Sequence, residues 1–267
     1  MIELKSVSGT YAKGSVQDVS FRLPNGKTYG VFSPTYADAV CLLALMSGAH
    51  TLTSGTVLAG GLDLHREARQ ARRSIGFLPA DLLPDNELTP LEYLMAAADA
   101  RDLPFDKTLR HVHELLELAD LSDKKDRLIV NLSRGEKRIL CLLQLLLGKP
   151  EFLMITSPLL GVNSKDAQKI RDLIRHFSDT YTIFVCTPAA NDLCELCDEI
   201  LVLQNGALKS IISADADALA AMQFDAPNED TPSPEETPTR KRTRWALLTE
   251  KGGDYEVLDT DEKEGKH

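Results

Sequence analysis

The sequence predicts an α/β fold whose core is a mainly parallel β-sheet covered by helices. Short apolar runs alternate with helical stretches through most of the 267 residues, and this alternation is typical of a parallel sheet between helices. One apolar run also leads through a tight turn straight into an apolar helix, over residues 30–48 with glycine at both ends. A phosphate-binding loop has this layout, because the helix N-terminus aims free N–H groups at an anion.

The first part of the chain is expected to be rich in strands. Residues 16–23 alternate apolar and polar side chains, as a half-buried strand does. Pro24 to Lys27 carry a turn signal just before the buried strand of the 30–48 unit. The strands expected here lie at 2–7, 16–23, 28–33, 54–61 (with a turn) and 74–78, with a charged helix at about 64–73.

Residues about 85–148 are expected to form a mostly helical insertion. Thr89 is a cap residue, and Pro90 occupies the first position of the helix that it starts. After the insertion, strands and helices alternate again and end in a hairpin that turns at Asn205 and Gly206. The expected elements are helices to about 100, at 105–120, 134–148 and 165–178, then a short helix, with strands at 151–156 and 182–187 and the hairpin at 200–208.

The composition changes after about residue 224. Residues 225–239 are acidic and rich in proline, which predicts a disordered linker. Residues 240–244 form a basic cluster that suits either a solvated tether or contact with anionic lipid. Two apolar stretches follow within 245–258, and their spacing is compatible with a terminal β-hairpin that would have to dock on something to be stable.

Composition and charge exclude several classes of protein. A formal net charge of -10 argues against nucleic acid as a partner. The longest apolar run, 139–147, is much shorter than the ~20 residues that a membrane span needs. The N-terminus enters a strand-like pattern directly, without a signal peptide. The five cysteines suit a reducing cytosol, and the C-x-x-C pair at 194–197 indicates two small helix residues rather than a metal site.

The 30–48 unit has the frame of a phosphate loop without its chemistry. In the motif G-x-x-x-x-G-K-[ST], lysine reaches the phosphates and the hydroxyl holds the metal. Here Ser33 and Asp38 stand at the glycine positions, Ala39 at the lysine and Val40 at the hydroxyl. The Asp38 carboxylate suits the positive helix end, but it would repel a triphosphate by about 4 kcal/mol per unit-charge pair at about 4 Å.

Several segments taken together, in order and spacing, resemble the nucleotide-binding subunit of an ABC transporter over residues 2–212. Tyr11 stands where this family has an aromatic that stacks on adenine, and residues 30–48 stand at the Walker A loop and helix. Residues 76–80 resemble the strand into the Q-loop, and Leu-Ser-Arg-Gly-Glu at 132–136 resembles the LSGGQ signature that opens a long helix. Residues 150–158 resemble Walker B, 161–163 the D-loop and 186–188 the switch segment.

The resemblance implies a P-loop NTPase-like cassette over 1–224, with an antiparallel β edge and a helical subdomain at about 85–148 that docks the membrane partner. It also implies that the ATPase machinery is missing, because phosphoryl transfer needs a lysine, Mg²⁺ and a carboxylate that positions water. We therefore expect no catalytic residues, no metal and no cofactor of its own. The changed positions are Ala39 (lysine), Val40 (metal hydroxyl), Ala80 (Q-loop glutamine), Thr156 (Walker B aspartate), Ser157 (catalytic glutamate), Asn163 (D-loop aspartate) and Pro188 (switch histidine).

The signature motif keeps its polar residues. In this family the signature of one subunit completes the ATP site of the opposite subunit, so Ser133, Gly135 and Glu136 are predicted to contact a partner's nucleotide and its Mg²⁺. The alternative is a plain capping box, with Ser133 as N-cap and Glu136 three residues on. Tyr11 has a similar alternative as a packed aromatic.

The function that the resemblance implies is that of a degenerate, non-hydrolysing half of an asymmetric cassette pair. Its partners would be an ABC cassette subunit, in a homo- or heterodimer, and a membrane permease, which places it in the cytoplasm on the inner face of the cell membrane. Two alternatives stay open: a working ABC transporter ATPase with atypical motifs, and a binding or regulatory scaffold on the cassette fold.

Overall fold

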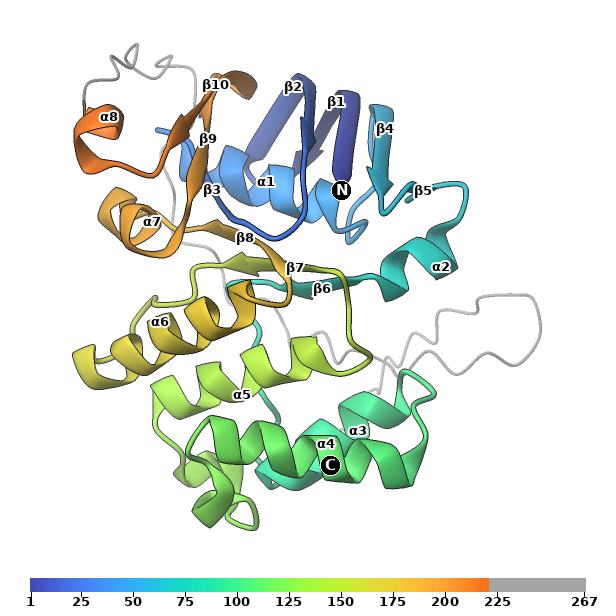
Figure 1. Cartoon of the computed structure of the whole chain (residues 1–267), viewed down its shortest axis with the longest axis vertical. Helices are drawn as coiled ribbons and strands as arrows, with labels where there is room; N and C mark the ends of the chain where they lie inside the picture. The colour runs from blue at the N-terminus through green and yellow to red at the C-terminus, as the bar shows by residue number, and fades with distance from the viewer. Residues whose placement is uncertain (221–267) are drawn as a thin grey trace, which may run out of the picture. The chain divides into compact units, whose positions relative to one another are not determined.

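The computed structural model describes residues 1–220, all within the compact unit Met1–Thr231 (Figure 1). The predicted linker at 225–239, the basic cluster at 240–244 and the terminal hairpin therefore lie outside the described residues. The same holds for the end of the predicted cassette at residue 224.

A six-stranded sheet forms the centre of the unit. Its order is β10-β9-β3-β8-β7-β6, and every neighbouring pair is parallel except the hairpin between β9 and β10. That hairpin turns at Asn205 and Gly206, both with positive φ (52° and 76°), as the Asn-Gly pair favours. The strands are β3 (Thr28–Phe32), β6 (Ile75–Leu78), β7 (Phe152–Thr156), β8 (Thr182–Cys186), β9 (Glu199–Gln204) and β10 (Ala207–Ser213).

A second, antiparallel sheet covers one face of the central sheet, with helix α1 (Tyr36–Met46) packed between the two (Figure 1). Most of α1 is buried, from Asp38 to Met46, which is why its sequence is apolar on nearly every side. One of the two apolar cores of the unit surrounds this helix. The antiparallel sheet has the order β2-β1-β4-β5, with β1 (Ile2–Tyr11), β2 (Gly14–Leu23), β4 (Ser54–Ala59) and β5 (Leu62–Asp63).

The other face of the central sheet is covered by helices, which enclose the second apolar core. In Figure 1 the helices α5 and α6 lie against the sheet, and α3 and α4 form a further layer beyond α5. These helices are α3 (Pro90–Asp99), α4 (Phe105–Leu118), α5 (Arg134–Leu146), α6 (Ser164–Ser178) and α7 (Ala190–Leu196), with 3₁₀ turns at Ser122–Lys124 and Ile129–Asn131. The short helices α2 (Ala68–Arg73) and α8 (Ala216–Ala220) complete the described chain.

The predicted fold class is confirmed: the fold is α/β, with a mainly parallel central sheet and a second, antiparallel sheet. The expected helix at about 64–73 is wrong in its first turn, because α2 begins only at Ala68. There the Asp63 carboxylate accepts hydrogen bonds from the N–H groups of His65 (2.8 Å) and Arg66 (3.1 Å), which makes a turn instead. The expected strand at 2–7 also ends too early, since β1 extends to Tyr11.

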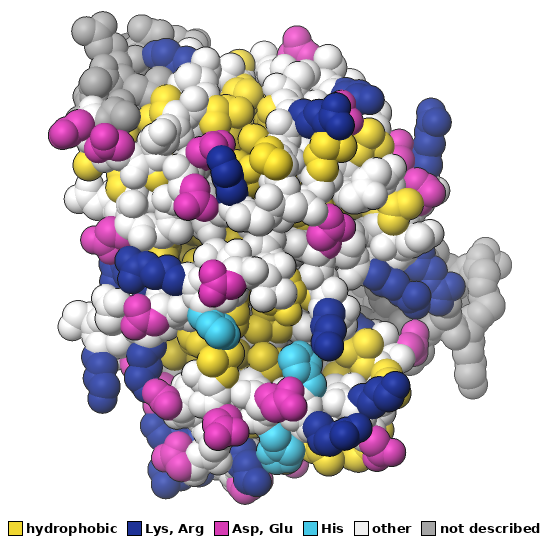
Figure 2. Space-filling view, in the orientation of Figure 1, with side chains coloured by type: hydrophobic (Ala, Val, Ile, Leu, Met, Phe, Trp, Pro, Cys, Tyr) yellow, Lys and Arg dark blue, Asp and Glu magenta, His cyan; other side chains and the backbone are white. Residues whose placement is uncertain are grey.

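The helical insertion predicted at about 85–148 contains α3, α4, the two 3₁₀ turns and α5, while its boundaries as a subdomain stay a prediction. Within residues 1–220 no helix combines the length and the apolar character that a membrane crossing requires. On the face drawn in Figure 2, the described basic and acidic side chains are interspersed instead of forming one continuous basic stripe.

Candidate functional site

The candidate site lies where the parallel strands β3, β7 and β8 end and α1 begins. The carboxyl ends of parallel strands meet at one edge of a sheet, and α/β proteins bind ligands at that edge. The helix N-terminus adds its free N–H groups, and the N-cap residue Thr35 makes no side-chain hydrogen bond to them. Sequence and topology therefore agree on the place where a phosphate would be expected.

Tyr36 spans this edge of the sheet. It is the first residue of α1, and its hydroxyl makes a hydrogen bond with the Oγ of Ser157, just after β7. The same hydroxyl lies 3.9 Å from the Sγ of Cys186 at the end of β8. Burial raises the pKa of the Tyr36 phenol far above its ordinary value, so the group is neutral at physiological pH. A neutral side chain thus links the helix to two strand ends across the space expected for phosphate.

Ser157 is held in place by its backbone as well. Its N–H donates to the carbonyl of Cys186 at 2.7 Å, and its φ of +46° lies in the left-handed region that few side chains adopt. The side chain is almost fully buried. The residue at the predicted position of the catalytic glutamate is therefore a fixed part of the closure made by Tyr36.

Asp38 lies in the first turn of α1 and is only 6% exposed. Its Oδ1 accepts a hydrogen bond from the N–H of Ser15 at 2.9 Å, which joins the helix to the start of β2. Burial raises the pKa of this carboxyl above its usual value. The approach between the two elements is close, since a Cβ on Gly14 would lie 1.9 Å from the carbonyl oxygen of Ala37. The chain's own carboxylate thus occupies the anion-favouring end of the helix.

Thr156 and Ala39 are turned toward the interior. Thr156 is fully buried, and its hydroxyl donates to the carbonyl of Leu78 at 2.7 Å. Ala39 is 1% exposed and belongs to the apolar core around α1. Side chains that serve packing therefore stand where the resemblance predicts a metal ligand and a phosphate-binding lysine.

Arg138 of α5 contacts the backbone just after β6 and at the end of β7. Its guanidinium is buried and donates to the carbonyl oxygens of Thr156 and Ser157 (3.3 Å to the latter). It also donates to the carbonyls of Pro79 (3.1 Å) and Ala80 (3.4 Å), after β6. Burial lowers the pKa of Arg138. With four carbonyl partners, this arginine ties together two strand ends and is fully engaged.

These residues do not fit a magnesium-bound triphosphate. The helix end holds a buried carboxylate, and the hydroxyl of Thr156 is already donated to a carbonyl. Across residues 1–220, no three His, Cys, Asp or Glu side chains gather in a group that could hold a metal ion. Of the other changed positions, Ala80, Asn163 and Pro188 are exposed and Val40 is half-buried.

The signature residues lie at the N-terminus of α5. Ser133 is the N-cap: its hydroxyl accepts from the Glu136 N–H, and the Glu136 carboxylate accepts from the Ser133 N–H, both at 3.0 Å. The Ser133 hydroxyl also donates to the Asp166 carboxylate of α6 at 2.9 Å. Gly135 is buried beneath that residue, because a Cβ on it would lie 2.2 Å from the Cβ of Asp166. The capping box is present, and a contact with a partner's nucleotide stays a prediction.

Burial opposes the ionisation of Glu136, but the hydrogen bonds from Lys124 and from the Ser133 N–H outweigh it and lower the pKa. Lys124 also forms an ion pair with this carboxylate. Tyr11, at the end of β1, is half-buried and packs against His50, with ring centroids 5.3 Å apart and planes at 56°. Its contact with an adenine also stays a prediction.

Sequence reasoning missed Tyr36, Arg138 and Asp166 as parts of these two sites. Tyr36 stands in the loop of the phosphate motif, and a large aromatic in that loop was the one signal that could have indicated a closure. The partners of Arg138 and Asp166 come from distant parts of the chain, so nothing local in the sequence identifies them.

Sequence comparison identifies a matching family model and several related proteins. A family model described as ABC transporter matches residues 16–159, more than half of the chain. The chain is 25% identical to the linearmycin resistance ATP-binding protein LnrL of Bacillus subtilis (strain 168), over 79% of this chain and 68% of that protein. It is 26% identical to the methionine import ATP-binding protein MetN 1 of Salmonella paratyphi A, over 78% of this chain and 64% of that protein.

Among solved structures, the chain is similar to the ATP-binding cassette MJ0796 in a dimeric, post-hydrolysis state bound to ADP and phosphate. The TM-score is 0.69, and the match covers 81% of this chain and 100% of that one. At 20% sequence identity, this likeness establishes the fold alone.

Proposed function

This chain belongs to the ABC transporter family, and from that membership we propose that it is a cassette subunit without ATPase activity of its own. It acts as the non-hydrolysing half of an asymmetric cassette pair that is coupled to a membrane permease. It works in the cytoplasm, on the inner face of the cell membrane. Its relatives include ATP-binding proteins of importers and of resistance systems, which supports a role in transport without fixing the substrate or its direction.

The observation that carries the proposal is the hydrogen bond between Tyr36 and Ser157 at the helix end where a phosphate would be expected. Phosphoryl transfer depends on positioning the nucleotide and neutralising its charge, with little covalent work left to the protein. Here the phenol bonds to Ser157 across the strand ends, and the Asp38 carboxylate occupies the helix end. Binding a triphosphate would require both groups to give up these hydrogen bonds, and Ala39 supplies no charge at the position of the motif's lysine.

An asymmetric pair would explain why the phosphate-loop motif has lost its lysine and hydroxyl while the signature motif keeps its polar residues. A homodimer of this chain would contain two closed sites, so a heterodimer with an intact cassette is the arrangement that retains hydrolysis. The MJ0796 cassette was solved as a dimer, which supports pairing through the same fold. Ser133 is exposed, and its hydroxyl can turn from the Asp166 carboxylate toward a partner's nucleotide.

The test uses the full chain, tagged and purified from its native membranes together with its bound subunits. We expect an intact cassette and a permease in the complex, and we expect Ser133→Ala to lower ATP turnover of the complex by about tenfold or more, as loss of a transition-state donor does. Thr89→Ala is the matched control, because Thr89 makes the same capping box on α3 without being part of the signature.

Three results would contradict the proposal. A complex without an intact cassette would leave no site for the pair to hydrolyse ATP. Equal turnover in the Ser133→Ala and Thr89→Ala complexes would reduce Ser133 to a helix cap. If deletion of residues 225–267 abolished all association, the scaffold alternative would take the place of the transporter half.

A further inference from the structure

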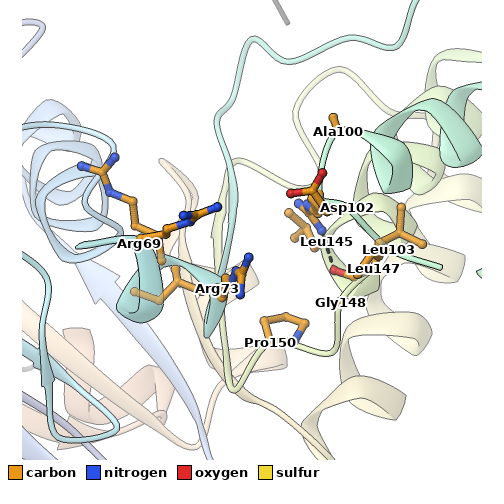
Figure 3. A pocket seen from close by; sticks show the side chains of 12 residues that line it. Arg69, Arg73, Ala100, Asp102, Leu103, Leu145, Leu147, Gly148 and Pro150 are labelled. Atoms are coloured by element: carbon orange, nitrogen blue, oxygen red, sulfur yellow. Dashed lines mark hydrogen bonds between the residues drawn. The ribbon is translucent and has the colours of Figure 1, made fainter. Parts of the chain in front are cut away.

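A hollow of about 470 Å³ opens away from the candidate site, between α2, the end of α3 and the turn from α5 to β7. Figure 3 shows Arg69 and Arg73 of α2 on one side, with Asp102 and Leu103 on the other. The volume falls within the ~300–1,000 Å³ typical of pockets for small molecules. None of the residues that form the candidate site line this hollow.

Positive charge dominates the rim. Four arginines line the hollow, at positions 69, 72, 73 and 101, against the single acid Asp102. This concentration stands out in a chain whose net charge is -10. Arg101 is bound to the wall, since its guanidinium donates to the carbonyls of Gln144 (3.0 Å) and Leu147 at the end of α5.

Arg72 and Arg73 are the arginines available for a ligand. Both are exposed, and within residues 1–220 neither has an ion pair or a side-chain hydrogen bond. They occupy the last turn of α2, where positive charge is stabilised by the negative end of the helix dipole. Stabilisation of the helix end explains why arginines stand on α2. It does not explain why Arg101 lines the same hollow.

Several apolar side chains also line the hollow, and together they are called its floor. They are the side chains of Ile75, Leu103, Leu145, Leu147 and Pro150. Leu145 and Leu147 are almost fully buried, so the floor is a fixed part of the helical core. A ligand that fits must combine a strong negative charge for the rim with an apolar part for the floor.

We propose that this hollow binds a phosphoryl group carried on an apolar body. Arginine suits phosphate because its planar guanidinium makes two parallel, charge-assisted hydrogen bonds to phosphate oxygens. Arg72 and Arg73 hold the phosphoryl oxygens, and the apolar part lies on Leu103 and Ile75. Either a soluble phosphate monoester or the headgroup of an anionic lipid has this chemistry. This proposal does not depend on whether the chain hydrolyses ATP.

The test measures binding of hexyl phosphate to the full chain by calorimetry, beside inorganic phosphate and hexanoate. We expect hexyl phosphate to bind more tightly than either, because only it supplies both the phosphoryl oxygens and the apolar chain. The double change Arg72→Gln and Arg73→Gln should weaken this binding by about tenfold or more, since two charge-assisted pairs are lost. Arg110→Gln with Arg127→Gln removes the same charge from exposed positions outside the hollow and should leave binding unchanged.

Vesicles separate the two sources of the ligand. If the chain binds phosphatidylglycerol vesicles but not phosphatidylcholine vesicles, and the hollow variant loses this binding, the ligand is a lipid headgroup. If hexyl phosphate binds and vesicles do not, it is a soluble phosphate ester. The proposal is overturned if hexyl phosphate does not bind, if hexanoate binds as tightly, or if the two double variants behave alike. Equal thermal unfolding of all three proteins checks that the variants fold.

Discussion

The N-termini of α1 and α5 share one physical feature, but a different kind of contact closes each of them. Each presents free N–H groups and a positive dipole end, and each is met by a carboxylate of this chain. At α1 the carboxylate of Asp38 is buried and bound to Ser15 of another element. At α5 the carboxylate of Glu136 closes a local capping box with Ser133 on the surface.

The difference lies in what must move for either helix end to meet a ligand. Opening α1 would disturb a packed core, because Tyr36 reaches Ser157, 121 residues away, and Asp38 is held by β2. Opening α5 needs only the Ser133 hydroxyl to exchange its bond with Asp166. The helix end of α1 is closed by contacts within the packed core, whereas that of α5 is closed by an exposed cap, which is why we propose that only the latter acts on a partner.

The largest effect is expected for Ala39→Lys, which restores the lysine of the phosphate motif. Because Ala39 is 1% exposed within the apolar core, the new ammonium would be buried without a partner. We expect a loss of about 3 kcal/mol or more in the free energy of unfolding, measured by urea denaturation. Ala96→Lys on α3, at an exposed position, is the control and should change stability by less than about 0.5 kcal/mol. A stable Ala39→Lys variant would mean that α1 opens more easily than its packing implies.

Gly14→Ala should have the next largest effect. Its Cβ would lie 1.9 Å from a backbone oxygen of Ala37, which cannot turn away as a side chain can. We expect a loss of about 2–3 kcal/mol in unfolding free energy, as in overpacked sites. At Gly135→Ala the new Cβ would lie 2.2 Å from the Cβ of Asp166, so a loss of the same kind is expected, reduced by the ~1 kcal/mol that alanine gains over glycine within a helix. Equal losses, or the reverse order, would contradict the view that α1 is the more rigid end.

The capping box of α5 should contribute about 1 kcal/mol to stability, as N-caps usually do. Ser133→Ala removes the hydroxyl that accepts from Glu136 and donates to Asp166. Thr89→Ala removes the equivalent cap of α3, so the difference between the two losses reports the Asp166 bond. Chemical denaturation measures both, and a much larger loss for Ser133→Ala would show that this helix end is as fixed as that of α1.

The smallest predicted effect is on the way the free energy of unfolding changes with pH. This change has opposite directions for Asp38 at α1 and Glu136 at α5. The folded chain binds the proton of Asp38 more tightly than the unfolded chain does, so its contribution to stability is lost as pH rises through the raised pKa. The pKa of Glu136 is lowered, so its contribution is present above the ordinary glutamate value and is lost as pH falls. Asp38→Asn and Glu136→Gln should each remove one of these trends from stability measured between about pH 3 and pH 7.

The sequence predicts much of the fold because the central elements are locally consistent. The apolar runs at 152–156 and 182–186 are strands, and the Asn205-Gly206 turn closes its hairpin as expected. The antiparallel sheet is less well predicted: β1 and β2 extend past their expected ends because they pair with each other up to Tyr11 and Gly14. Pairing of that kind depends on the partner strand and not on the segment itself.

The candidate site is predicted in outline and missed in its contacts. The changed positions at Ala39, Val40 and Thr156 follow from the motif frame, and the structure explains two of them by burial. The aromatic in the loop was a signal for a closure, but its partner Ser157 could not be predicted, because the contact joins a loop to a strand end far along the chain. The capping alternative for Ser133 is local, which is why the sequence alone could identify it.

The central claim is tested most directly by ATP turnover of the purified chain alone, measured with and without Mg²⁺ beside an intact cassette as positive control. Because Tyr36 and Asp38 close the phosphate position, we predict no turnover above the buffer background and no retention of Mg-ATP in equilibrium dialysis. Magnesium-dependent hydrolysis that co-elutes with the chain on a sizing column would contradict the claim and establish a working ATPase with atypical motifs.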